Sequence, residues 1–532
     1  METFRHLHPF QGLVLSIFVI PFLYVLLDYI RIIRLRQRLP PGPFPWPLVG
    51  NHYQIKLPRP WLWLDELSRK HDSALITLWR GHQPMIFFHD AWEIADLLDK
   101  RSHIYSSRPQ MVMLGDSRSA TYRDQAVLPY GDVWRHHRRL THNVVGSQAV
   151  RTHRPIQDNE IKVMLQDLLQ HPESFVKAIE RYSVSVVSCI GFGRRVAQMD
   201  DNVAQMALKF MEGVDLAIPG QFLMESLPLL LRLPRLVYPP ARRILENNRK
   251  MTRFFTFLSR EAGTSYTASP KCFSALLIQE QEKGKLSDEE IAFLTGNLIG
   301  GGVDTTSSTS ISFVFAMCAF PEVQQKAFAE INRVVGARMP EWDDEEHLPY
   351  CRALLSECLR WRTVTILGGI PHAPIQDDVY KGYIIPKGTW IAGNMWSIHR
   401  QSRDFPDPDQ FRPERFLEDR RPFPNKKGHS AFGWGRRQCS GQPLAEQGLF
   451  LTFSRLLWAF EMKPALDSTG QEEKLDIFAF TESENIRPEP FGARFIPRSE
   501  PRVGIIRQEA IIARENLKVF DGETTVQTPT FI

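Results

Sequence analysis

The longest apolar pattern in the chain predicts one central helix. Ser287 and Glu290 have the spacing of a capping box, and an apolar run then covers 291–320 until a proline ends it. A helix of that length would span about 45 Å, enough to cross a globular domain. A membrane span is the competing interpretation, but Asn297, Asp304 and a run of hydroxyl residues are costly in hydrocarbon. The pattern therefore favours a buried core helix.

Shorter patterns predict a mainly α fold with small β-sheets. Apolar residues at helical spacing run through 442–458, and a helix is also expected over 350–361. Strand-forming residues at 74–79 and 85–88, joined by a turn-like segment, predict a hairpin. The segment 378–391 predicts further short strands. Beyond its N-terminal end, no linker or internal repeat divides the chain.

The N-terminal end predicts a membrane anchor. Positions 10–30 are predominantly apolar and would cover about 31 Å as one transmembrane helix. Arginines follow at once, which favours a cytosolic side for the rest of the chain, and no cleavage site of a signal peptide is evident. We therefore expect an anchor with a basic flank, a proline-rich stiff hinge, one large catalytic domain, and a polar C-terminal tail to which the sequence assigns no role. Their respective ranges are 1–38, 39–51, 52–505 and 506–532.

Composition narrows the possible partners. The 532 residues carry a net charge of only +5, with no concentrated basic stripe, so we expect no nucleic-acid partner. The six cysteines show no disulfide or zinc spacing, which is typical of a domain in a reducing cytosol. A hydrophobic content of 43% is ample for a large core and an apolar pocket.

One cysteine lies in a loop that suits a metal-bound thiolate. Around Cys439 the chain reads F-x-x-G-x-R-x-C-x-G, from Phe432 to Gly441, just before the helix expected over 442–458. Backbone N–H groups and a helix start stabilise a thiolate. Gly435 permits a tight turn, and Arg437 places a fixed cation two residues before the sulfur. A buried, inert cysteine is the alternative, and the five fixed motif positions weigh against it.

The central helix contains an unusual patch of glycines. Gly300, Gly301 and Gly302 precede Asp304 and Thr305, although each glycine costs a helix about 1 kcal/mol relative to alanine. Glycines would let a flat ligand and a small gas molecule approach the backbone, beside an acid and an alcohol that can relay protons. A helix-packing patch explains the same glycines about as well when they are taken alone.

Two residues elsewhere are candidates for binding a carboxylate-bearing ligand. Trp134 and Arg138 lie one helical turn apart, so a carboxylate fits between an indole N–H and a cation. A basic surface helix is the simpler alternative. His372 follows a proline, and such a histidine is more often a plain turn residue.

Another motif predicts a buried ion-pair network. Glu357 and Arg360 share one helix face, and Arg415 lies in a proline-bounded segment that could bring a second guanidinium to the same carboxylate. Taken alone, the helical pair would more often be a surface contact.

The order of these motifs resembles the cytochrome P-450 superfamily of haem-thiolate monooxygenases over about residues 40 to 500. The resemblance implies the superfamily's mainly helical fold and a haem b cofactor. Cys439 would be the axial iron ligand. Asp304 and Thr305 would take the acid and alcohol positions of the oxygen-activation motif. Ser440, Gln442 and Thr363 depart from the commonest forms of these motifs without changing the ligand or the glycines.

The resemblance also assigns residues to the cofactor and to the scaffold. Phe432 belongs to the ligand loop, while Trp134, Arg138, His372 and Arg437 would bind haem propionates. The network of Glu357, Arg360 and Arg415 would be structural. These roles follow from the resemblance alone.

Partners and reaction follow from the same resemblance. It implies O2, a hydrophobic small molecule, a separate NADPH-dependent reductase and a single-pass endoplasmic-reticulum membrane anchor with a cytosolic catalytic domain. The segment 361–417 looks most like filamentous-fungal enzymes of secondary metabolism, of the O-methylsterigmatocystin oxidoreductase type, which oxidise polyketides and alkaloids. Desaturation, coupling or ring rearrangement are alternative outcomes. A non-catalytic haem-binding or redox-accessory membrane protein is a further alternative. It would predict a closed pocket or a lost acid–alcohol pair, and the presence of Asp304 and Thr305 contradicts the second of these.

Overall fold

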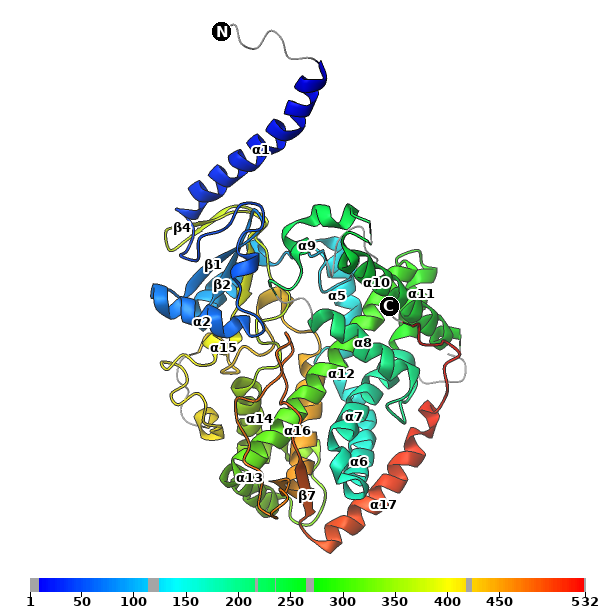
Figure 1. The fold of residues 1–532 in the computed structure, drawn as a ribbon. Coiled ribbons are helices and arrows are strands. Elements are labelled where there is room, and N and C mark those ends of the chain that lie inside the picture. Colours follow the sequence, from blue (N-terminus) through cyan, green and yellow to red (C-terminus); the bar gives the residue numbers. More distant parts are fainter. Residues whose placement is uncertain are drawn as a thin grey trace.

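Helix α12 (Asp288–Ala319) crosses the middle of the computed structural model, as the apolar pattern predicts (Figure 1). Its capping box is confirmed: the Ser287 hydroxyl accepts from the N–H of Glu290, whose carboxylate accepts from the N–H of Ser287. Most of its side chains are buried, so α12 is a core helix. The structure describes residues 9–112, 124–215, 219–234, 236–264, 272–417 and 423–530.

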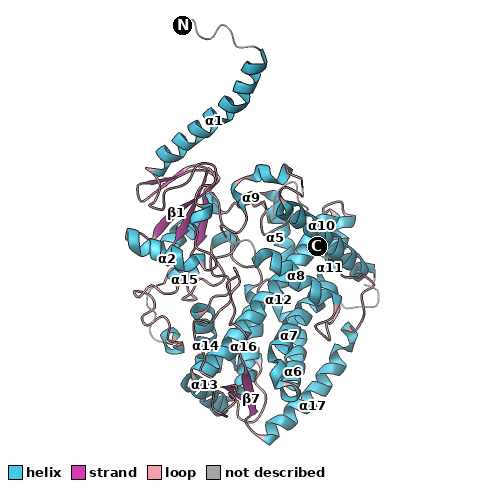
Figure 2. Cartoon of the chain, in the orientation of Figure 1, coloured by secondary structure: helices cyan, strands magenta, loops and turns pink. Residues whose placement is uncertain are grey.

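Helices make up most of the body, as expected (Figure 2). Its longer helices, besides α12, are α2 (Pro60–His71), α5 (Asp132–Val145), α6 (Arg154–Gln170), α7 (Phe175–Phe192), α8 (Asn202–Asp215), α10 (Pro239–Thr264), α11 (Phe273–Glu282), α13 (Pro321–Val334), α14 (Pro349–Trp361), α16 (Gln442–Ala459) and α17 (Glu500–Leu517). Helix α12 contacts α7, α8, α10 and α16, which surround it.

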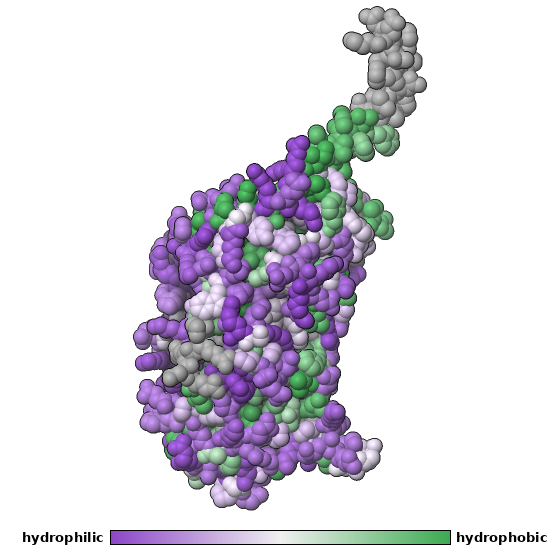
Figure 3. Space-filling model, turned by 90° about the vertical axis from the view of Figure 1, so that its left-hand side faces the viewer, coloured by the Kyte–Doolittle hydropathy of each residue, from purple (hydrophilic) through white to green (hydrophobic). Residues whose placement is uncertain are grey.

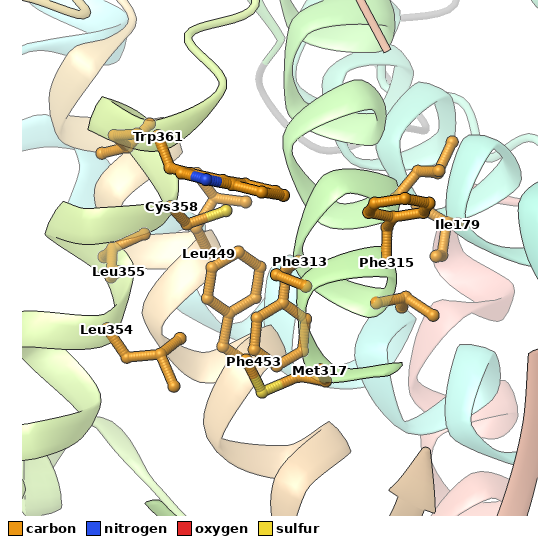
Figure 4. Packing of buried hydrophobic residues seen from close by; sticks show 14 of the residues in the cluster. Ile179, Phe313, Phe315, Met317, Leu354, Leu355, Cys358, Trp361, Leu449 and Phe453 are labelled. Carbon is orange, nitrogen blue, oxygen red and sulfur yellow. The ribbon is translucent and has the colours of Figure 1, made fainter. Parts of the chain in front are cut away.

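Aromatic and aliphatic side chains pack the C-terminal half of α12 against its neighbours. Figure 4 shows Phe313 of α12 face to face with Phe453 of α16, with ring centroids 3.9 Å apart. Trp361, at the end of α14, is fully buried and packs beside Phe315. Large rings buried this way each contribute about 1.5–3 kcal/mol of transfer free energy, so they stabilise the packing of α12 against α14 and α16.

Three small sheets are present in the part of the chain that the structure describes. The predicted hairpin is confirmed: β1 (Leu75–Arg80) and β2 (Gln83–Phe88) are antiparallel, with Leu75 opposite Phe88. The third strand of that sheet, β5 (Trp390–Gly393), pairs in parallel with β2. The other two sheets are antiparallel pairs, formed by β3 (Asp378–Tyr380) with β4 (Tyr383–Ile385) and by β6 (Phe460–Pro464) with β7 (Ala493–Pro497).

The proline-rich segment 39–51 is hydrogen-bonded to the sheet formed by β1, β2 and β5. The N–H of Thr77 donates to Pro41 O at 2.8 Å, and the N–H of Trp79 donates to the Asn51 side chain at 2.7 Å. A Cβ on Gly42 would lie 1.9 Å from Thr77 O, so only glycine allows this close approach. The segment expected to be a connector is thus part of the folded body.

Helix α1 (Pro9–Arg36) projects from the body beside the same sheet (Figure 1). Its last turns are packed, because Ile32 is buried against the sheet and the Tyr29 hydroxyl donates to Pro45 O at 3.0 Å. The boundary expected at residue 38 therefore lies beyond the point where α1 joins the body. Within the described residues, no helix is both long and apolar enough to cross a membrane, so the predicted span is not confirmed.

The C-terminal end is more structured than its polar sequence indicates. Helix α17 continues through the boundary expected between residues 505 and 506, and Ile506, Ala513 and Leu517 are buried, with α17 contacting α6. The chain then runs along α8 and α10 as a C-terminal strap, residues 518–530. Hydrogen bonds that hold this strap include those from Arg195 N to Phe520 O, from Asn202 Nδ2 to Val526 O, and from Thr525 N to Glu261 Oε1.

Candidate active site

The Cys439 loop has the geometry that its sequence predicts. Cys439 lies just before α16, and its N–H donates to Phe432 O at 2.9 Å. Gly435 has a φ of 55°, and a Cβ there would lie 2.0 Å from Leu98 O. Any larger residue would therefore push this loop off its neighbour.

Opposing effects act on the Cys439 thiol. Burial is the largest effect and raises its pKa overall, although the N–H of Gly441 and the charge of Arg138 act in the opposite direction. The side chain lies inside the fold, and its accessible surface faces a cavity of about 440 Å³. This thiol, open to the cavity and with N–H groups and a cation beside it, is the kind of sulfur that can become a thiolate ligand.

Helix α12 forms a second wall of the cavity. It contributes Gly301, Gly302, Thr305, Thr306 and Thr309. Apolar side chains from α7, α8 and α12 line the cavity as well, namely Val186, Val187, Phe210, Met211 and Leu298. The lining of the cavity is thus largely apolar, and α12 contributes hydroxyl groups to it.

The three glycines of the patch have different surroundings. A Cβ on Gly300 would lie 2.4 Å from Phe210, and one on Gly302 would lie 2.3 Å from Val187, so these two glycines permit helix packing. A Cβ on Gly301 would meet nothing within 4 Å, and Gly301 lines the cavity. Only Gly301 therefore leaves open space beside the backbone.

Thr305 lines the cavity, whereas Asp304 is not among the residues found to line it. The Thr305 hydroxyl donates to Gly301 O at 2.6 Å, which leaves its lone pairs able to accept from water. The Asp304 carboxylate accepts from Asn485 Nδ2 at 2.9 Å, and burial raises its pKa. The predicted acid–alcohol pair is present, but in this conformation only the alcohol faces the cavity.

Several cations gather at one side of the cavity. Arg437 donates to the carbonyls of Ser106, Gln125 and Leu128, and its guanidinium lies 4.3 Å from the Trp134 ring. Arg138 donates to Gln438 O at 2.8 Å. Trp134, Arg138 and Arg437 all line the cavity, so the structure brings these predicted residues together.

Arg108 is a cavity residue that sequence reasoning missed. It is half-buried, and burial lowers its pKa to about 9 while burial and neighbouring arginines lower that of Arg437 to about 8. Neither arginine, nor Arg138, forms an ion pair with a carboxylate among the described residues. Lone buried cations are costly, so this cluster calls for an anionic ligand. A single arginine before a proline gives no spacing signal that could have revealed it.

The two carboxylates of haem b fit this cluster, and its iron fits the Cys439 sulfur. Arg108, Arg138, Arg437 and Trp134 would hold the propionates, and Phe432 lines the cavity beside the loop. The residues present therefore match the predicted cofactor.

His372 also lines the cavity, but its hydrogen bond limits its role. Its Nδ1–H donates to Tyr105 O at 2.9 Å, and burial holds its pKa well below the usual value. In the neutral ring, Nε2 is then an acceptor, so His372 meets a carboxylate only after gaining a proton.

The predicted ion-pair network of Glu357, Arg360 and Arg415 is confirmed. Glu357 accepts from Arg360 Nε at 2.6 Å and from Arg415 Nε at 3.2 Å, and the side chains of Glu357 and Arg360 are fully buried. Arg360 also donates to His399 O and Pro408 O. The network thereby joins α14 to the loop that precedes the cysteine loop.

The fold and the cavity define a haem-thiolate site. Comparisons with known proteins agree: the family model for cytochrome P-450 matches residues 40–486. The cytochrome P-450 monooxygenase virE of Hypocrea virens is 36% identical over 90% of this chain and 89% of its own length. The cytochrome P-450 monooxygenase fogE of Aspergillus ruber is 34% identical over 92% of each chain. The corresponding enzyme polD of Polytolypa hystricis is 33% identical over 90% or more of both.

The chain belongs to the cytochrome P-450 family. It is an oxidoreductase of the monooxygenase class, and the family binds haem iron through a cysteine thiolate. Such enzymes generally use O2, a redox-partner reductase and hydrophobic substrates.

Proposed function

We propose that this chain is a membrane-anchored monooxygenase that hydroxylates an apolar fungal secondary metabolite, such as a polyketide or alkaloid intermediate. One oxygen atom of O2 enters a C–H bond of the substrate, and the other leaves as water with two electrons from NADPH and two protons. The observation that carries the proposal is the cavity, which brings Cys439, Thr305 and an apolar lining into one space.

The roles of the chain's own residues follow from this arrangement. When bound, a thiolate-ligated haem supplies the redox chemistry that reduces O2 and oxidises the substrate. Arg108, Arg138 and Arg437 neutralise the propionates and fix the plane of the cofactor. The apolar side chains exclude bulk water and hold the substrate. Thr305 holds water in the cavity and passes protons to it at Oγ1.

Basic residues beside the cysteine loop suit an acidic electron donor. The exposed basic residues are Arg135 and Arg139 on α5, together with Lys426, Lys427 and Arg436 ahead of Cys439 in the chain. Complementary charge speeds the encounter of two proteins more than it tightens their complex. A separate NADPH-dependent reductase would dock there.

Exposed apolar residues support attachment to a membrane at the α1 end of the molecule. Figure 3 shows apolar residues along α1, where it leaves a mostly hydrophilic body. Exposed fractions on α1 reach 71% at Phe18 and 66% at Phe22. Leu236, in the segment between α9 (Leu223–Ser226) and α10, is 97% exposed, and α9 lies at the same end of the molecule as α1 (Figure 1). The endoplasmic reticulum is the compartment we propose.

Deleting residues 1–28 should release much of the protein from membranes and leave the haem spectrum unchanged. The deletion ends before Tyr29 and Ile32, which are packed on the body, so the fold should persist. The measurement is membrane fractionation with a spectrum of each fraction. Deleting 1–38 is the matched comparison, and it should lower stability because Ile32 is lost. Loss of haem binding in the shorter deletion would contradict an anchoring role.

Replacing Thr305 by alanine should uncouple NADPH consumption from product formation. The change removes the cavity hydroxyl but leaves Cys439 and the cation cluster intact. Because proton transfer of this kind typically contributes on the order of 100-fold, the ratio of product to hydrogen peroxide should fall by a comparable factor. The measurement is the stoichiometry of NADPH, product and peroxide. Thr306→Ala removes a neighbouring cavity hydroxyl, and its NADPH consumption should stay coupled to product formation. If Thr305→Ala were coupled as tightly as Thr306→Ala, the role of Thr305 would be excluded.

A further inference from the structure

A polar side chain interrupts the apolar wall of the cavity. Asn297 lies on α12, two turns before Thr305, and both residues line the same cavity. Its neighbours Leu294 and Leu298 line the cavity too, and both are apolar. Eight residues of helix separate Asn297 from Thr305 by about 12 Å along the axis. The amide is therefore remote from the oxygen-activating end.

A buried carboxylate fixes which end of this amide faces the cavity. Asn297 Nδ2 donates to Asp124 Oδ1 at 2.6 Å, and the N–H of Ala126 donates to the same oxygen at 2.8 Å. Asp124 is 6% exposed. Burial raises its pKa to about 6, so it is ionised at neutral pH and can only accept hydrogen bonds. The NH2 group of Asn297 must therefore point at Asp124.

The carbonyl oxygen of the amide is left for a ligand. Among the described residues, nothing donates a hydrogen bond to Asn297 Oδ1, although this side chain is part of the cavity wall. An acceptor in an apolar wall favours a ligand that brings a donor and disfavours one that leaves the oxygen unpaired. Asp124 acts only through Asn297 and is a positioning residue.

We infer that Asn297 orients the substrate by accepting a hydrogen bond from a hydroxyl or amine N–H at the end remote from the oxidised carbon. This inference rests on the proposed function and narrows its substrate class. The substrate is an elongated, largely apolar molecule whose donor lies on the order of 10 Å from the carbon that is oxidised. A compact terpene or an unsubstituted hydrocarbon lacks this combination.

Matched ligands on the purified, haem-loaded full-length protein test the inference. The probes are 4-phenylphenol, which carries a donor, and 4-methoxybiphenyl, which has the same rings but no donor. Binding is followed by the shift of the haem absorption band. The wild type should bind 4-phenylphenol about tenfold more tightly, the factor expected from one buried hydrogen bond. Asn297→Leu should remove this preference, and Asp124→Asn, which lets the amide turn over, should weaken it.

Leu298→Ala is the matched control, because it enlarges the same wall without changing a polar group. It should alter the affinity for both probes by the same factor. The inference would be overturned if the wild type bound both probes equally or gave no shift with 4-phenylphenol. It would also be overturned if Asn297→Leu kept the wild-type preference. If Asn297→Leu does not fold, Asp124→Asn takes its place in this comparison. Reductase-supported turnover of the two probes at equal efficiency would sink the substrate class and leave the monooxygenase proposal standing. Normal ligand shifts without any turnover would instead count against the proposed function.

Discussion

Replacing Cys439 by alanine should abolish monooxygenase activity and remove the carbon monoxide band of thiolate-ligated haem. No other cysteine among the described residues lines the cavity, so none can take its place. The thiolate donates the electron density that favours cleavage of O2, and a neutral ligand such as water does not. The measurement is the difference spectrum of the reduced protein, with turnover measured beside it.

The matched control for this substitution is Cys318→Ala. Cys318 is buried in the core, where burial holds its pKa far above the usual value and keeps the thiol neutral. The control should keep the spectrum and the activity. Turnover that persists in Cys439→Ala would refute the assigned ligand.

Replacing Glu357 by alanine should leave little haem-loaded protein. The change leaves the fully buried Arg360 without its carboxylate partner and removes an acceptor from Arg415. An uncompensated buried charge costs about 3–5 kcal/mol, a large share of the roughly 5–15 kcal/mol by which a domain is stable. The measurement is haem content per protein together with the thermal unfolding midpoint.

Glu515→Ala tests whether burial is the cause. Glu515 pairs with Lys518 at the same three-residue spacing, but its side chain is 69% exposed on α17. Solvent and salt screen such a pair, so haem loading should not change. If Glu357→Ala behaved like this control, the network would be a surface contact after all.

Local sequence signals were enough for the parts of the site that lie on single elements. The capping box predicts where α12 begins, and the helix after Gly441 predicts the place of Cys439. The spacing of Glu357 and Arg360 predicts their shared face. In each of these cases one turn of backbone decides the geometry, whereas Arg415, which joins Glu357 as expected, comes from a segment 58 positions away.

Contacts between segments that are distant in the chain could not be predicted from the sequence. Arg108 joins the cation cluster through packing of its loop against the cysteine loop, and Asn297 meets Asp124 across 173 positions. Asp304 turns toward Asn485, which lies 181 positions further along the chain. The glycine patch shows the same limit, because only the positions of Phe210 and Val187 reveal which glycines are needed for packing.

The C-terminal strap has a consequence for how the enzyme is made. Residues 518–530 are the last part of the described chain to leave the ribosome, yet they bind α8 and α10, which are synthesised hundreds of residues earlier. Helix α8 carries Phe210 and Met211 of the cavity wall. Domains begin to fold from the N-terminal side during synthesis, so this wall receives its contacts from the strap only after residues 518–530 have been synthesised. Maturation of the substrate cavity is thereby tied to synthesis of the C-terminal strap.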